Sequence, residues 1–313
     1  MRPLLLALAV VAGCQSAPPP PAASRPPAAA AGDTDAFTAS LLADVAALAS
    51  NDLRGRRAGS PGGAQAAAYV EGRLRAAGVE PLGGSYRQPF ALPGGGEGSN
   101  VIGLVPGTVF PRSYLVVTAH YDGLGVISGR VHNGADDNAS GTATLLALAE
   151  RLRADPPAHS VVLAALDGEE LGLVGAEAFV DQPPVPLGAI LAVVNMDMVS
   201  RGDGGALWMA GTAHYPHLRP LLEPVAERAA VPVAFGHDTG AGADNWTGAS
   251  DHAAFHRRGV PFVYVGVEDH PDYHRHTDDV ERIDPVFFGG AARTVLDAVA
   301  TLDASHAALA AAR

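Results

Sequence analysis

Histidine and acidic residues end one apolar run of this chain in a pattern that could bind a metal. His120 and Asp122 close the run LVVTAHYD, and Asp137 lies soon afterwards, where a helical pattern begins. Alternate residues of an extended segment point to the same side, so Asp122 can contact the ring of His120. Carboxylates commonly orient metal-binding histidines in this way. One His-x-Asp pair is weak evidence alone, so the rest of the chain decides its meaning.

Three further apolar runs end in residues of the same chemical types. SVVLAAL leads to Glu169 and Glu170, AILAVVNM leads to Asp197, and FVYVGV leads to a loop with histidines at 270, 274 and 276. Each acidic pair by itself could be a solvated loop. Four strand ends that all carry nitrogen or carboxylate ligands instead indicate one shared metal site.

Continuous apolar runs that alternate with helical patterns predict the fold. Such runs are typical of parallel strands buried on both faces, and ligands bind outside the carboxyl ends of these strands. We therefore expect a single α/β domain over residues 35–313, with three layers, α/β/α, and a mostly parallel, mixed central sheet. Helices are expected at about 35–50, 64–77, 140–152, 216–229 and 285–308, with a short helix opening near 250.

Charge argues against one class of partner. The chain has 313 residues and a formal net charge of −12, and all of its 21 basic residues are arginine. An acidic chain without a basic stripe is not expected to bind nucleic acid. Its oligomeric state cannot be inferred from these features.

The N-terminus has the pattern of an export signal. Arg2 precedes an apolar segment at 4–12 that is too short for a stable membrane span. Val11-Ala12-Gly13-Cys14 resembles the bacterial lipobox, whose cysteine is lipidated. We expect residues 1–14 to be a lipoprotein signal peptide ending at Cys14 and residues 15–34 to be a Pro/Ala-rich tether. The protein would then be exported and anchored to the cell envelope by the lipid, unless the signal is an ordinary secretory one.

Six short motifs, taken together, resemble metallopeptidase family 28, the di-zinc aminopeptidase family, over roughly residues 36–308. They are HYDG at 120, GADDNASG at 134, DGEELGLVGA at 167, NMDM at 195, SDHAAF at 250 and DYHRHTDD at 272. Any one of them would be weak evidence. The resemblance implies the zinc aminopeptidase (phosphorylase/hydrolase-like) fold and two Zn²⁺ per chain.

The resemblance also assigns roles to seven residues. It implies His120 and Asp197 as ligands of one zinc, Glu170 and His274 as ligands of the other, Asp137 as the bridging ligand, Glu169 as general base and Asp122 as the partner of His120. It further implies a cis peptide bond between Asp137 and Asn138. The chain departs from the usual family pattern after His274. The spacing to Asp278 favours His274 over His276 as the zinc ligand. His270 and His276 are expected to be loop or pocket residues.

The implied activity is that of an exopeptidase. Of the possible exopeptidases, an aminopeptidase is the favoured interpretation; it would attack peptides with a free N-terminus by means of a metal-bridging hydroxide. Carboxypeptidase-like cleavage would require arginines near the site, for which the candidates are Arg201, Arg257, Arg258 and Arg275. Glutaminyl-cyclase-like chemistry uses a single zinc, which the complete ligand set disfavours. A catalytically inactive binding or envelope protein is disfavoured for the same reason. The side-chain pocket is expected within residues 201–249 and near Tyr264.

Overall fold

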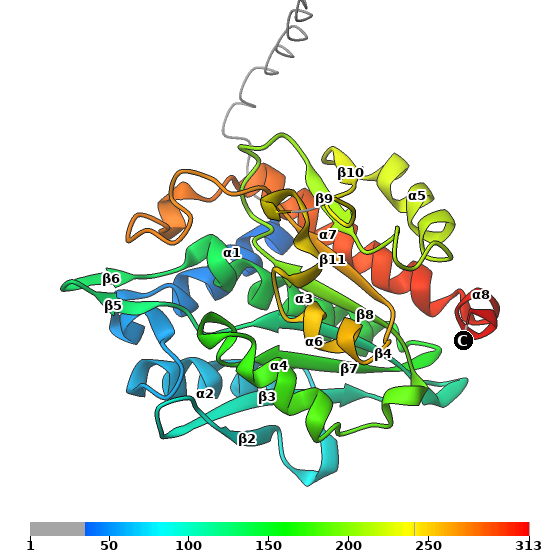
Figure 1. Ribbon diagram of the computed structural model, residues 1–313, viewed down its shortest axis with the longest axis horizontal. Helices are drawn as coiled ribbons and strands as arrows, with labels where there is room; N and C mark the ends of the chain where they lie inside the picture. Colours follow the sequence, from blue (N-terminus) through cyan, green and yellow to red (C-terminus); the bar gives the residue numbers. More distant parts are fainter. Residues whose placement is uncertain (1–34, 241, 313) are drawn as a thin grey trace, which may run out of the picture. The chain divides into compact units, whose positions relative to one another are not determined.

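The computed structural model describes residues 35–240 and 242–312. The lipobox at Cys14 and the tether at 15–34 lie outside these residues, so both stay predictions. A nine-stranded sheet in the order β1-β3-β7-β4-β8-β11-β9-β10, with β2 paired to β3, forms the centre of the domain (Figure 1). The predicted domain therefore contains one continuous sheet.

The middle of the sheet is parallel, and an antiparallel pairing borders it on each side. The strands β4 (Phe110–His120), β7 (His159–Leu166), β8 (Ile190–Asp197) and β11 (Phe262–Gly266) are neighbours in the order β7-β4-β8-β11. They are the four predicted apolar runs. The other strands are β1 (Glu80–Pro81), β2 (Arg87–Ala91), β3 (Glu97–Val105), β9 (Leu207–Ala210) and β10 (Val233–Phe235). Since β3 runs antiparallel to β7, and β9 to β11, the predicted mixed sheet is confirmed.

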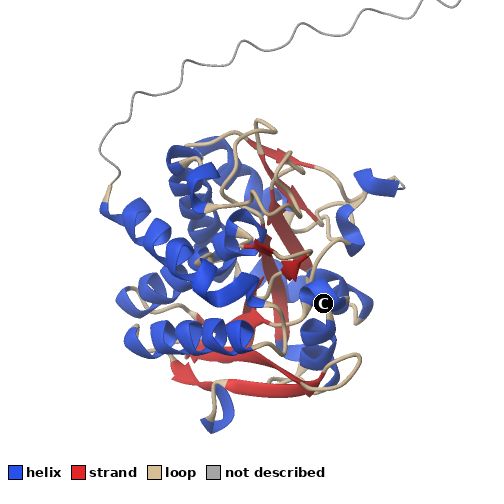
Figure 2. Ribbon diagram, turned by 90° about the vertical axis from the view of Figure 1, so that its left-hand side faces the viewer, coloured by secondary structure: helices blue, strands red, loops and turns tan. Residues whose placement is uncertain are grey.

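Helices cover both faces of this sheet, which produces the predicted three layers (Figure 2). One layer contains α1 (Ala36–Leu48), α2 (Pro61–Ala76), α3 (Gly141–Ala154), α5 (Arg219–Arg228), α7 (Pro285–Asp303) and α8 (His306–Ala311); the other contains α4 (Val174–Asp181) and α6 (His252–Arg257). Side chains alternate between the two cores along each strand: Leu115 and Val117 belong to one core, and Val116 belongs to the other. Both faces of β4 are therefore apolar, which explains its continuous run.

Helix boundaries differ from the predicted ones where side chains hold backbone groups. Helix α2 begins before residue 64, because the Ser60 hydroxyl accepts a hydrogen bond from the Gly63 N–H (3.1 Å) and Pro61 suits the first turn. The final helix is divided into α7 and α8, and Asp303 at the division accepts the N–H groups of Ala158 and His159. Strands β9 and β10 were not predicted, because they have only four and three residues.

A separate two-stranded hairpin, β5 (Gly125–Ile127) and β6 (Arg130–His132), projects from the domain beside the loop that leads to Asp137 (Figure 1). Within the described residues, we find no helix with the length and apolar character needed to span a membrane.

Candidate metal centre

The carboxyl ends of the parallel strands bring the expected side chains together. His120 is the last residue of β4 and Asp197 is the last residue of β8, and these two strands are hydrogen-bonded neighbours. Glu169 and Glu170 follow β7, the other neighbour of β4. In open α/β folds, ligands bind at the carboxyl ends of the parallel strands, where these residues lie.

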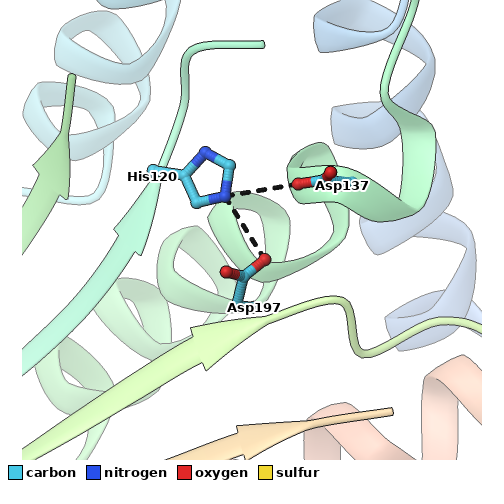
Figure 3. A group of neighbouring side chains, drawn as sticks. All are labelled: His120, Asp137 and Asp197. Atoms are coloured by element: carbon cyan, nitrogen blue, oxygen red, sulfur yellow. Dashed lines mark hydrogen bonds and ion pairs between the residues drawn. The ribbon is translucent and has the colours of Figure 1, made fainter. Parts of the chain in front are cut away.

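Two groups of ligand atoms share one carboxylate. The Nε2 atom of His120 lies 3.3 Å from Oδ1 of Asp137 and 3.3 Å from Oδ1 of Asp197 (Figure 3). The Nε2 atom of His274 lies 3.2 Å from Oδ2 of Asp137 and 3.6 Å from Oε2 of Glu170. In each group the ligand atoms lie within 4.8 Å of one another. Asp137 thus offers one oxygen to each group, as a bridging ligand would.

Buried polar contacts hold Asp137 in this position. The turn Ala135–Ser140 precedes α3, and the Asp137 N–H donates to the Asp278 carboxylate (3.0 Å). The side chain of Asn138 donates to the Met196 carbonyl (2.9 Å) and accepts from the Gly141 N–H (2.9 Å). The Asp137–Asn138 peptide bond is cis, which confirms the prediction made for this bond.

Asp122 contacts both His120 and the acidic turn after β7. The Nδ1 atom of His120 lies 3.3 Å from the Asp122 carbonyl oxygen and 3.5 Å from its carboxylate. The same carboxylate accepts the N–H groups of Glu169 (3.1 Å) and Glu170 (3.4 Å). Asp122 therefore contacts the ring of His120 and also joins the acidic turn to the end of β4.

Glu169 and Glu170 lie in a tight 3₁₀ turn, Glu169–Leu171, and not in an extended segment. The alternation of side chains that holds along an extended segment therefore does not apply to this pair. The two residues nevertheless differ in their relation to the two groups of candidate ligand atoms. Glu170 belongs to the group around His274, whereas Glu169 belongs to neither group and faces the cavity between them.

The charges of the site favour bound cations. Burial, with the negative charge of Asp197 and Asp251, raises the pKa of Glu169 to about 10, and burial beside Asp137 raises that of Glu170 to about 8. Burial opposes protonation of His120, but Asp197 and the other carboxylates raise its pKa well above its usual value. Acidic groups packed this closely are stabilised by cations. Two imidazoles with carboxylates and no thiolate fit zinc.

A cavity of about 280 Å³ opens over these groups. Its lining residues are Asp137, Glu169, Glu170, Asp197, Met198, Trp246, Ala249, Tyr264, Val267, Asp269, Tyr273 and His274. Trp246, Ala249 and Tyr264 come from the region expected to form the side-chain pocket. The remaining apolar lining includes Met198, directly after β8, and Val267, directly after β11. The sequence analysis did not predict these residues as part of the pocket.

Three of the four candidate arginines form ion pairs away from the cavity, and the fourth, Arg275, is exposed and does not line it. Arg201 is buried and paired with Asp203 (2.6 Å) and Asp272 (3.0 Å). Arg257 and Arg258 pair with Glu177 and Asp181 on the surface. Among the described residues that line the cavity there is no arginine.

The other two histidines of the loop take no part in either group. His270 is buried, and its Nε2 atom lies 3.1 Å from the Asp136 carboxylate. His276 contacts Arg130 (2.6 Å) and lines a separate groove beside β6. Both are loop residues, as expected, and neither lines the cavity over the two groups.

Comparisons with known proteins identify relatives of this arrangement. The model of peptidase family M28 matches residues 100–299. A probable leucine aminopeptidase of Arthroderma otae is 26% identical over 229 residues, which are 69% of this chain and 58% of the relative. The chain spans less than two thirds of the length of the first curated relatives that it matches.

Solved structures share the fold. BSAP, a zinc aminopeptidase from Bacillus subtilis, superposes with a TM-score of 0.68 at 16% identity, covering 86% of this chain and 95% of that one. A glutaminyl cyclase from Porphyromonas gingivalis superposes with a TM-score of 0.69 at 18% identity, covering 84% and 97%. These likenesses confirm the predicted three-layer fold.

Proposed function

The chain belongs to peptidase family M28, and from that premise we propose that it is a di-zinc exopeptidase that releases N-terminal residues from peptides. One observation carries this proposal: Asp137 directs one oxygen to the group with His120 and Asp197 and the other to the group with Glu170 and His274. Zinc bound there would polarise the substrate carbonyl and lower the pKa of a water molecule to about 7.

Glu169 is the proposed general base. Its carboxylate faces the cavity without belonging to either group of ligands. It would accept a proton from the attacking water and pass it to the nitrogen of the leaving amine. Burial raises the pKa of Glu169 to about 10, and zinc bound beside it would lower that pKa, because a nearby positive charge favours the ionised carboxylate that accepts the proton.

The cavity favours a substrate with a free amine over one with a free carboxylate. Besides the proposed zinc ligands, the acidic residues Glu169 and Asp269 line it, and no arginine does so among the described residues. A protonated N-terminus is attracted by this lining, whereas a C-terminal carboxylate is repelled. Aminopeptidase action is therefore preferred to carboxypeptidase action on this site.

Cyclisation of N-terminal glutamine is the second candidate, because one structural relative is a glutaminyl cyclase. The presence of both histidines and of all three ligand carboxylates favours hydrolysis at a paired-metal site. The two reactions give different products from one substrate. A peptide with N-terminal glutamine would release free glutamine by hydrolysis and pyroglutamyl peptide by cyclisation.

The test is to measure zinc content and substrate range on the same purified protein. After zinc loading and dialysis, the content should approach two per chain. Aminoacyl-nitroanilides should be cleaved, and the same compounds with an acetylated amine should not. A zinc content that stays at one, or cleavage of blocked substrates or from the C-terminus, would refute the proposal.

The place of action is also part of the proposal. The segment 4–12 and the sequence Val11-Ala12-Gly13-Cys14 support export and lipid attachment at Cys14. The Pro/Ala-rich segment 15–34 would then separate the enzyme from the membrane surface of a bacterial cell envelope.

A further inference from the structure

Arg56 is a fully buried arginine close to the candidate metal centre, yet neither the ligand set nor the proposed chemistry uses it. Its exposed fraction is 1%. The backbone has positive φ at three successive residues, Arg54 (50°), Gly55 (70°) and Arg56 (49°). Gly55 is required here, because a Cβ atom would lie 2.4 Å from the His132 carbonyl oxygen. The chain thus adopts an unfavourable backbone conformation where this side chain enters the core.

The guanidinium group donates to four backbone carbonyls of three separate segments. Nε donates to Tyr121 (2.8 Å), Nη2 donates to Gly134 (2.9 Å), and Nη1 donates to Leu48 (2.9 Å) and to Asn133. Tyr121 stands between His120 and Asp122. Asn133 and Gly134 begin the segment that leads to Asp137. One side chain therefore joins the backbone on either side of the site.

Such an arrangement requires the planar fork of an arginine. Its five N–H donors point in fixed directions, whereas a lysine ammonium is a single point. Burial lowers the pKa of Arg56, but Asp122, Asp137, Asp278 and Glu170 oppose this change, and the guanidinium stays protonated. Its positive charge interacts with Asp137 and Glu170, two of the proposed zinc ligands, so the charge alone would weaken zinc binding. A favourable effect of Arg56 on zinc must therefore come from its hydrogen bonds.

We propose that Arg56 is a positioning residue, which ties the segment bearing His120 to the segment bearing Asp137 and so sets the geometry of both metal half-sites. This inference rests on the proposed function only in requiring that zinc binds at these residues. The alternative is that Arg56 merely attaches α1 to the domain through the Leu48 carbonyl.

The first test compares two variants of Arg56. Arg56→Lys keeps the charge, but the three donors on its one nitrogen cannot satisfy all four carbonyls. Arg56→Met removes the charge and every one of these hydrogen bonds. Zinc affinity is measured by competition with a chelator, and kcat and KM are measured on the zinc-loaded protein. We expect both variants to lose about 10–100-fold in zinc affinity, as for other groups that support ligands. We expect kcat to fall by a similar factor while KM changes little, because misplaced ligands reduce the rate.

Arg73 provides the matched control. It lies in α2, pairs with the buried carboxylate of Asp44 and with Glu150 (2.8 Å), and contacts no segment of the site. Arg73→Lys should lower thermal stability and leave zinc affinity unchanged. If Arg56→Lys also loses only stability and retains normal zinc affinity, Arg56 is structural and the proposal is wrong.

A measurement on the wild-type protein covers the case in which the Arg56 variants do not fold. If Arg56 favours the zinc-binding geometry, zinc must equally favour the hydrogen bonds of Arg56, because coupling is reciprocal. With ¹⁵N-labelled arginine, removal of zinc should accelerate hydrogen exchange at Nε of Arg56 and not at Nε of Arg73. Equal exchange with and without zinc would overturn the inference. A wild-type protein that binds no zinc would instead refute the proposed function.

Discussion

Replacing Glu169 by glutamine tests its proposed role as a base separately from the proposed role of Glu170 as a zinc ligand. Glutamine keeps the shape and nearly the volume of the side chain but cannot accept the proton. The turn itself should survive, because the Asp122 carboxylate holds it through the backbone N–H groups of Glu169 and Glu170. The change therefore removes one chemical capacity and little of the structure.

The expected magnitudes differ for the two neighbours. General bases typically contribute about 10²–10⁴ in rate, so Glu169→Gln should lower kcat by that factor with zinc content unchanged. This corresponds to about 3–5 kcal/mol in the activation barrier. Glu170→Gln removes a carboxylate whose Oε2 atom lies 3.6 Å from Nε2 of His274. Groups that only support a ligand typically contribute about 10–100-fold to metal affinity, so this change should weaken zinc binding by a larger factor.

The assay is kcat and zinc content, measured on the same preparations of both variants. Glu223→Gln is a suitable control, because Glu223 is exposed on α5 and pairs with Arg219 (2.8 Å) away from the site. Excess zinc should partly restore the activity of Glu170→Gln and not that of Glu169→Gln. Loss of metal from Glu169→Gln, or turnover close to normal, would show that Glu169 is not the base.

Three other predictions follow from particular residues. His274→Ala should lose one zinc while His276→Ala keeps both, since His276 contacts Arg130 and belongs to neither ligand group; metal analysis that gives the reverse would move the ligand by two residues. Cys14→Ser should abolish lipid modification, and a wild-type mature protein without lipid, examined by mass spectrometry, would contradict the lipobox. Burial, with the charges of Asp122 and Asp197, raises the pKa of Asp251 from 3.8 to about 8, so the folded state binds a proton that the unfolded state has lost between these pH values. The free energy of unfolding should therefore fall as pH rises through that window, and denaturant titrations should find a weaker pH dependence in Asp251→Asn.

The parallel centre of the sheet could be predicted because burial on both faces leaves a visible pattern. Apolar runs lead up to His120, Leu166, Asp197 and Gly266, and each run lies in a strand of that centre. The antiparallel edges left a weaker pattern. Strands β9 and β10 are short, and their pairing depends on the return of the chain after β8, which no local signal specifies.

The residue types at the strand ends indicated a shared metal site, and the resemblance to family 28 assigned the individual ligands. Apart from Asp122, the residues that hold these side chains could not be named. Asp278 was noticed only for its spacing, yet its carboxylate accepts the N–H groups of Asp136 and Asp137. Asp251 was part of a motif, but its burial without a hydrogen-bond partner depends on packing between α6 and the sheet. Such contacts join residues far apart in sequence, and a single sequence carries no record of them.

The candidate ligands of the two groups are supported unequally. His120 and Asp197 end neighbouring strands, so the sheet itself fixes the distance between them. The remaining three come from turns and loops. Polar contacts at the backbone hold the turns that carry Asp137 and Glu170, but His274 is half exposed, has positive φ and stacks on Tyr273. We therefore expect the group around His274 to depend most on bound metal for its order, whereas His120 and Asp197 are held in place by the sheet.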